Sequence, residues 1–190
     1  MKEYAEDIKQ AVEVMRRGGV ILYPTDTIWG LGCDASNEQA VERIFAIKQR
    51  DDAKSMLCLV DSFSKLEYYV ESVPSLAYDL IDLADKPLTI IYDKARNVAP
   101  KLIAEDGSIG IRVTAEEFSK ELCMRMRGAV VSTSANISGQ PSAKNFAQID
   151  PEIVKAVDYV VKYRQTDNSE HKASGIIKLG NDNQVKVIRE

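Results

Sequence analysis

The chain has 190 residues, of which 45% are hydrophobic and 28% are charged, and its formal net charge at pH 7 is −4. This length is enough for one domain with a substantial core, so we expect one domain over residues 1–190. Proteins that hold a nucleic-acid backbone over a whole face are usually basic. Any basic site here is therefore local, which favours a small anion over a long polymer.

Targeting, redox and metal signals are weak in this sequence. The apolar runs are too short to span a membrane, and the acidic start lacks the pattern of a signal peptide. Cys33, Cys58 and Cys123 are odd in number and far apart, as is typical of reduced core thiols. The single histidine, His171, argues against a zinc site and against histidine acid–base catalysis. We expect a cytoplasmic protein with no membrane contact and no protein-held metal.

The pattern of apolar residues predicts alternating helices and strands. Residues from Tyr4 to Met15 recur at helical spacing, and Gly18-Gly19 ends that helix. Further helices are expected over 37–47, 116–126 and 150–157, and two more are expected after capping serines, Ser62 and Ser75. Strands are expected over 20–23, 56–60, 88–92, 108–113, 129–131, 159–161, 174–179 and 185–189. Because there is no strict βαβ period, we expect an α/β fold with a twisted, mixed parallel and antiparallel sheet and flanking helices.

Two loops rich in hydroxyl groups follow predicted strands. The first runs from Pro24 to Gly32 and the second from Ser132 to Ser142. Such residues either satisfy backbone groups within a turn or form a substrate wall at the end of a strand.

Basic residues cluster between a predicted helix and a predicted strand. Lys48, Arg50 and Lys54 stand at i, i+2 and i+6. On an extended backbone this even spacing would place all three side chains on one side, where they could hold phosphate. The alternative is a solvated turn partly neutralised by Asp51 and Asp52.

Arg112 stands in the middle of an apolar strand. It points opposite to Ile109 and Ile111, on the face shared by Ser108 and Gly110. This pattern indicates either an open groove on that face or an exposed arginine on an edge strand.

The remaining motifs exclude several kinds of chemistry. The sequence has no Walker phosphate loop, no dinucleotide glycine fingerprint and no Ser-His-Asp set. Hydroxyl-rich loops with lysine and arginine are sufficient for phosphoryl or nucleotidyl transfer, because positioning and charge neutralisation supply most of the acceleration. The residues by themselves therefore predict a groove that binds a polyphosphate, with or without Mg²⁺.

Three stretches resemble, in order and spacing, the YrdC-like threonylcarbamoyl-AMP synthase family in its short form. They are Lys48-Gln49-Arg50, the run from Tyr23 to Ala35, and Ser132-Thr133-Ser134-Ala135-Asn136-Ile137-Ser138-Gly139. The likeness extends from Gly19 to Arg189. It implies a twisted mixed sheet with a basic concave groove.

The resemblance also implies a reaction and its partners. Such enzymes convert L-threonine, bicarbonate or CO₂, and ATP to threonylcarbamoyl-AMP and pyrophosphate, with Mg²⁺ carried by the nucleotide. A partner transferase then moves the threonylcarbamoyl group to a tRNA adenosine, and a weak direct contact with RNA is compatible with the family.

Roles for individual residues follow from the same resemblance. Lys48 and Arg50 would be catalytic. The residues expected to bind ATP are Lys48, Arg50, Lys54, Ser108, Ser134, Asn136, Ser142 and Arg189. The residues expected at the threonine end are Thr27, Arg112, Ser132 and Ser174, with Arg112 binding the carboxylate.

The sequence departs from the family pattern at several positions. Asp51, Ser55 and Thr114 replace usual prolines, Gly175 replaces a usual threonine, and Leu59 stands where some members have a histidine. Two alternatives to the synthase follow. One is a non-catalytic or altered paralogue that binds nucleotide or RNA, and the other is a carbamoyl-adenylate-forming relative.

Overall fold

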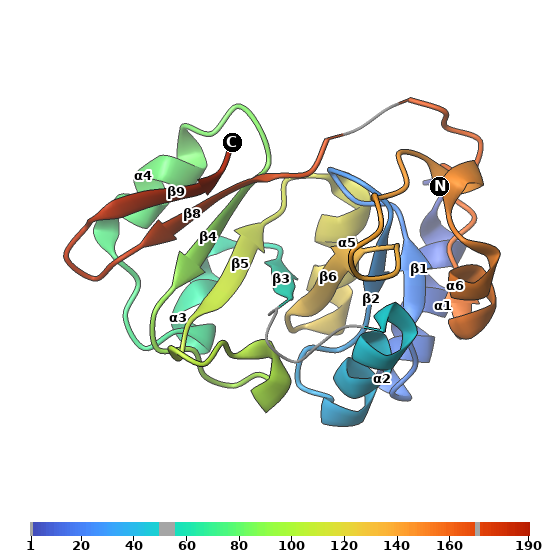
Figure 1. Ribbon diagram of the computed structural model, residues 1–190, viewed down its shortest axis with the longest axis horizontal. Helices are drawn as coiled ribbons and strands as arrows, with labels where there is room; N and C mark the ends of the chain where they lie inside the picture. Colours follow the sequence, from blue (N-terminus) through green and yellow to red (C-terminus); the bar gives the residue numbers. More distant parts are fainter. Residues whose placement is uncertain (1, 50–55, 170–171) are drawn as a thin grey trace.

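The computed structural model describes residues 2–49, 56–169 and 172–190. Within these ranges, strands β1 to β9 form one sheet in the order β7-β1-β2-β6-β3-β5-β4-β8-β9 (Figure 1). The pairs β1/β7, β3/β5 and β4/β8 are parallel and the others are antiparallel, which confirms the predicted mixed sheet. The strands are β1 (Ile21–Tyr23), β2 (Gly30–Gly32), β3 (Leu57–Val60), β4 (Leu88–Tyr92), β5 (Ile109–Val113), β6 (Val130–Ser134), β7 (Tyr159–Val160), β8 (Gly175–Leu179) and β9 (Val185–Arg189).

Helices flank this sheet on both faces, with α2 in front of it and α5 behind it in Figure 1. The helices are α1 (Ala5–Arg16), α2 (Glu38–Lys48), α3 (Leu66–Tyr69), α4 (Ser75–Asp82), α5 (Glu117–Met126) and α6 (Pro151–Ala156). Short 3₁₀ turns are η1 (Phe63–Lys65), η2 (Pro100–Leu102) and η3 (Phe146–Gln148). In the part of the chain that the structure describes, no helix is long and apolar enough to cross a bilayer.

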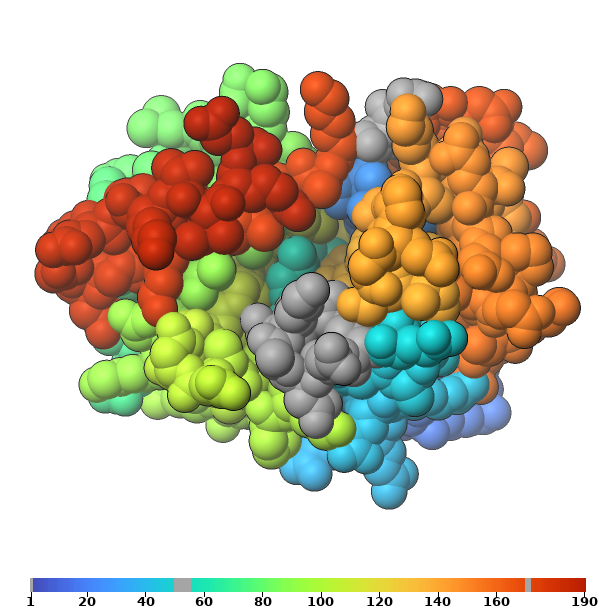
Figure 2. Space-filling model, in the orientation of Figure 1, coloured from blue at the N-terminus to red at the C-terminus, as the bar shows by residue number. Residues whose placement is uncertain are grey.

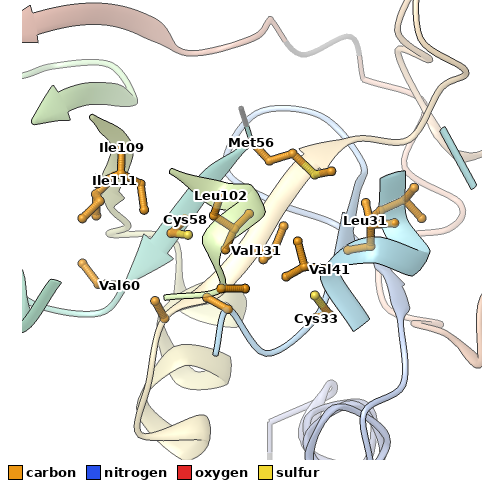
Figure 3. Close-up of a cluster of buried hydrophobic side chains, with 14 of the residues drawn as sticks. Leu31, Cys33, Val41, Met56, Cys58, Val60, Leu102, Ile109, Ile111 and Val131 are labelled. Carbon is orange, nitrogen blue, oxygen red and sulfur yellow. The ribbon is translucent and has the colours of Figure 1, made fainter. Parts of the chain in front are cut away.

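The two faces of the sheet bury separate apolar clusters. One cluster joins the sheet to α2, α3, α4 and α6 and includes Ile109, Ile111 and Val131 (Figure 3). The other joins it to α1 and α5 and includes Leu59 and Val130. Because side chains alternate along a strand, Gly110 and Arg112 lie on the face opposite to Ile109 and Ile111. This is the α1/α5 side, where the helices leave part of the sheet uncovered.

Side-chain caps fix the starts of three helices. Asn37 accepts a hydrogen bond from the Ala40 amide at α2, Glu116 accepts two at α5, and Asp150 accepts one at α6. The predicted serine caps are wrong. Ser62 precedes η1 without a capping bond, and Ser75 lies inside the first turn of α4, where Pro74 occupies the N-cap position.

Two predicted loops contribute strands. The sequence predicts a loop over Gly30–Gly32, but these residues form β2 between β1 and β6. A Cβ on Gly32 would lie 2.6 Å from the Tyr23 ring and 2.9 Å from the Val131 carbonyl oxygen, so close strand approach requires glycine here. Strand β6 likewise continues through Ser134, because the hydroxyl residues pair with β2 and β3 while their side chains meet an open pocket.

The three cysteines are free and buried, as the sequence predicted. Burial raises the pKa of the Cys58 thiol to about 12 and also raises those of Cys33 and Cys123. We expect Ellman's reagent at pH 8 to give no signal with the native protein and to titrate three thiols after denaturation in guanidinium chloride. Reaction of any thiol in the native state, at the rate of a small free thiol, would contradict this packing.

Candidate active site

A cavity of about 240 Å³ occupies the uncovered part of the sheet on the α1/α5 side. Figure 2 shows the hollow between the β8–β9 hairpin and the orange segment that follows β6. Its floor comes from β3, β4, β5 and β6, and its walls come from the loop before β2 and the segment that enters β8. Segments distant in sequence therefore contribute to one pocket.

Most of the predicted substrate-binding residues within the described ranges line this cavity. They are Thr27, Arg112, Ser132, Ser134, Ser142, Ser174 and Arg189. The lining also includes Ile28, Gly30, Met56, Leu57, Thr89, Ile91, Gly110, Thr133, Ala173 and Ile176. One pocket thus holds two cations, a row of hydroxyl groups and an apolar floor.

Arg112 lies in β5, between β3 and β4, with its side chain 2% exposed. The edge-strand alternative for Arg112 is therefore wrong. Its Nη2 lies 2.8 Å from Asp26 Oδ1, but Arg112 Nε has no hydrogen-bond partner in the described chain. An arginine that lines a pocket and has a donor without a partner is suited to a planar carboxylate or a phosphate.

The second cation, Arg189, reaches the same pocket from β9. Its Nε donates to the Ser174 carbonyl oxygen at 2.9 Å, and the Ser174 and Thr89 hydroxyls are hydrogen-bonded at 2.9 Å. Burial lowers the pKa of Arg189, and the charge of Arg112 lowers it further. Since like charges gathered in one pocket repel, an anionic ligand between them would be stabilised.

The hydroxyl wall before β2 is held by its own hydrogen bonds. The Thr25 hydroxyl donates to the Ile28 carbonyl oxygen at 2.7 Å and is bonded to the Thr27 hydroxyl at 3.0 Å. The neighbouring Trp29 is 6% exposed and packs on Phe146 at 4.9 Å between ring centroids. Trp29 therefore anchors the wall in the core, while Thr27 faces the pocket.

Lys48 has a different environment from the one predicted. It is the last residue of α2, and Gln49 follows it in a left-handed conformation with φ of 49°, so the extended spacing assumed for Lys48 is wrong. Lys48 is fully buried, and its Nζ donates to the carbonyl oxygens of Ser134 and, at 2.8 Å, Asn136. The Ser138 amide in turn donates to the Lys48 carbonyl oxygen. The side chain thus fastens the loop after β6 from behind and does not line the cavity.

Two other predicted ATP-binding residues also lie outside the cavity lining. Asn136 uses its Nδ2 to bind the carbonyl oxygens of Ile137 and Gln140, which shapes the loop after β6. Ser108 donates to Asp106 at 2.5 Å in the turn before β5. The remaining two, Arg50 and Lys54, lie outside the described residues.

Two further residues, Thr89 and Asp26, shape the pocket although the sequence pattern does not single them out. Thr89 was assigned to an apolar strand, although its alternation with Ile90 is a signal for a polar position on the pocket face. For Asp26 the sequence predicts only a role in satisfying backbone groups of a turn. Its pairing with Arg112 comes from a contact between β5 and the loop before β2, which the sequence pattern does not reveal.

Together, the fold and the pocket define a mixed α/β domain whose pocket, lined by two arginines and a set of hydroxyl groups, is suited to an anionic ligand. The arginines can bind two separated negative charges, and the hydroxyl groups can orient the ligand between them. Among the residues described, no group of three or more His, Cys, Asp or Glu side chains could hold a metal ion.

Comparison with known proteins agrees with this description. The Sua5/YciO/YrdC family model, which carries the description "Telomere recombination", matches residues 13–190. The chain is 36% identical over 165 residues to the threonylcarbamoyl-AMP synthase of Stenotrophomonas maltophilia, covering 85% of this chain and 87% of that protein. The crystal structure of E. coli YciO has a TM-score of 0.83 at 29% identity, covering 97% of this chain and 89% of that chain.

A third relative was crystallised with a small molecule. The structure of P. abyssi Sua5 complexed with L-threonine has a TM-score of 0.78 at 27% identity, covering 92% of this chain and 51% of that chain. The chain thus spans about half the length of that protein. From the family match over most of its length, this chain belongs to the Sua5/YciO/YrdC family.

Proposed function

We propose that the chain is an L-threonylcarbamoyladenylate synthase, which converts L-threonine, bicarbonate or CO₂, and ATP to threonylcarbamoyl-AMP and pyrophosphate. The observation that carries this proposal is the meeting of Arg112 and Arg189 with hydroxyl groups from β6 and the loop before β2 in one cavity. Curated relatives with this activity cover most of the chain.

Threonine would bind at the Arg112 end of the pocket. The guanidinium of Arg112, which lines the pocket and has an Nε without a hydrogen-bond partner in the described chain, suits the amino-acid carboxylate. Thr27, Ser132 and Ser174 offer hydroxyl partners for the polar atoms of the ligand. That P. abyssi Sua5 was crystallised with L-threonine supports this choice of substrate.

ATP would bind at the other end, over the loop after β6. Ser134 and Ser142 face the cavity there, and Arg189 can close over the nucleotide. Lys48 and Asn136 would serve this end by holding the loop in shape. A direct contact of Lys48, Arg50, Lys54 or Ser108 with ATP remains a prediction from the family resemblance.

The chemistry requires no nucleophile from the protein. The threonine amine forms an N–C bond to bicarbonate with loss of water, which gives a carbamate, and a carbamate oxygen then attacks the α-phosphorus of ATP. The bond from the α-phosphorus to its bridging oxygen breaks, and pyrophosphate leaves with that oxygen. The protein would hold the carbamate in line and neutralise charge that grows on the leaving group. Mg²⁺ would arrive with the triphosphate, its usual carrier.

The product implies a partner. Threonylcarbamoyl-AMP is a reactive mixed anhydride, so a transferase must take it up and pass the group to a tRNA adenosine. We propose a cytoplasmic location for this exchange. A weak direct contact between this chain and RNA is part of the same proposal.

Pyrophosphate release tests the function directly. We expect release only when ATP, L-threonine and bicarbonate are all present, with a large loss of rate when any one is omitted. ATP is the source of pyrophosphate, and the nucleophile forms from threonine and bicarbonate. A coupled pyrophosphatase assay measures the rate of pyrophosphate release. The Arg189→Met variant, purified in parallel, serves as the control preparation.

The omissions separate the alternatives. Release that is indifferent to threonine would contradict the proposal and point to another adenylating relative. Binding of RNA without any turnover would favour the non-catalytic paralogue. Pyrophosphate release when carbamoyl phosphate replaces threonine and bicarbonate would identify the carbamoyl-adenylate reaction.

A further inference from the structure

Asp26 lies behind Arg112 as seen from the pocket. It does not line the 240 Å³ cavity but lines a second cavity of about 550 Å³, together with Thr114 and Glu116. Its side chain is 12% exposed, and its Oδ1 lies 2.8 Å from Arg112 Nη2. The buried guanidinium is thus held between a carboxylate on one side and an open pocket on the other.

This ion pair is close but incompletely hydrogen-bonded. Asp26 Oδ1 is close to Arg112 Nη2, but the Nη2–H group is not aligned with it, so Oδ1 has no hydrogen-bond partner in the described part of the chain. Arg112 Nε also has no hydrogen-bond partner there. Buried polar groups in this state cost free energy that a ligand can recover. Arg112 lines the pocket, so a carboxylate bound there can recover part of this cost once a small rotation of the guanidinium brings its N–H groups into line with the ligand and with Asp26.

Asp26 is also the only ion-pair partner of Arg112 among the residues described. Arg189 lies near enough for its charge and that of Arg112 to repel. Burial raises the pKa of the Asp26 carboxyl and the charge of Arg112 opposes that rise, with Glu116 adding a smaller upward effect. Without Asp26, the guanidinium would have no charged partner to fix its direction.

We propose that Asp26 is a positioning residue that orients Arg112 toward the carboxylate of the amino-acid substrate. This inference rests on the proposed function, since it takes L-threonine as the ligand. Two physical effects of Asp26 act in opposite directions on the affinity of the pocket for the threonine carboxylate. Its negative charge weakens the attraction of the pocket for a carboxylate, whereas its hold on Arg112 strengthens the bonds that the carboxylate makes.

The Asp26→Asn variant decides between these effects, because it keeps the shape and removes the charge. We expect the KM for L-threonine to rise about tenfold to a hundredfold, the size expected for a misplaced binding group. The KM for ATP should stay within about twofold, because the nucleotide end does not touch Asp26. Asp158→Asn, which removes a carboxylate paired with Arg43 away from the pocket, is the matched control and should leave both KM values unchanged.

Ligand binding without turnover supplies a second measurement. In calorimetry, wild-type protein should prefer L-threonine to L-threoninol, which lacks the carboxylate, and Asp26→Asn should lose most of that preference. Asp26→Glu retains the negative charge, so it should fold and recover part of the preference for L-threonine. It replaces the Asn variant in this measurement if that variant is unstable. On an Arg112→Lys background, Asp26→Asn should add little further loss, because the group it positions is already gone.

Each other result overturns the proposal in a distinguishable way. Tighter threonine binding by Asp26→Asn would make Asp26 a charge brake, and an equal loss for threonine and ATP would make it a general structural residue. Wild-type protein that fails to bind L-threonine would overturn the proposed function itself and this inference with it.

Discussion

Replacing Lys48 with methionine should both destabilise the protein and stop turnover. The Lys48 ammonium bonds the carbonyl oxygens of Ser134 and Asn136 from a fully buried position. Methionine fills the space of the stem but leaves these carbonyl groups without their donor, which should cost about 2–3 kcal/mol of unfolding free energy. The loop that carries Ser134 would then lose its shape, and pyrophosphate release should fall to background.

Denaturation in urea, followed by fluorescence of the single tryptophan, measures the stability. Lys155→Met is the matched control. Lys155 is exposed, and its ion-pair partner among the described residues is Glu152 on the same helix, so its loss should cost no more than about 0.5 kcal/mol. If Lys48→Met is inactive yet as stable as the wild type, Lys48 acts on the phosphates alone, and its structural role is refuted.

Replacing Arg112 with methionine should have the largest effect on threonine use. The substitution removes the buried guanidinium that the threonine end offers to a carboxylate, and we expect threonine-dependent turnover to fall by at least about 10³-fold. It also leaves Asp26 buried without its cation, which should cost about 3–5 kcal/mol of stability.

A double variant separates these two losses. Adding Asp26→Asn to Arg112→Met removes the unpaired carboxylate, so most of the stability should return in thermal or urea unfolding. The activity should not return, because the carboxylate-binding group is still missing. Recovery of turnover in the double variant would show that Arg112 matters for folding and not for the substrate.

Local patterns in the sequence predicted much of the fold. The helix over 37–47 has its cap and its apolar stripe in the sequence, and the structure places α2 at Glu38–Lys48. The alternation from Ser108 to Val113 placed Arg112 opposite the core residues, and the structure confirms that orientation. Such features depend on periods of a few residues, which the chain displays directly.

Features that depend on tertiary contact could not be predicted in this way. Strand β2 is two glycines around Leu31, and only the close approach of β1 and β6 explains it. The charge spacing predicts an extended segment at Lys48, because no local pattern shows that α2 continues to Lys48. The left-handed backbone conformation of Gln49 is equally hidden in the sequence. The Asp26–Arg112 pair joins residues 86 positions apart, and family resemblance assigned a role only to the arginine.

A crystal structure of the protein with L-threonine and a non-hydrolysable ATP analogue would test the central claim most directly. The account places the amino-acid carboxylate on Arg112 and the phosphates over the turn at Ser134, with Arg189 closing the same cavity. Threonine and nucleotide bound at separate places on the surface, or density for neither in this cavity, would contradict it.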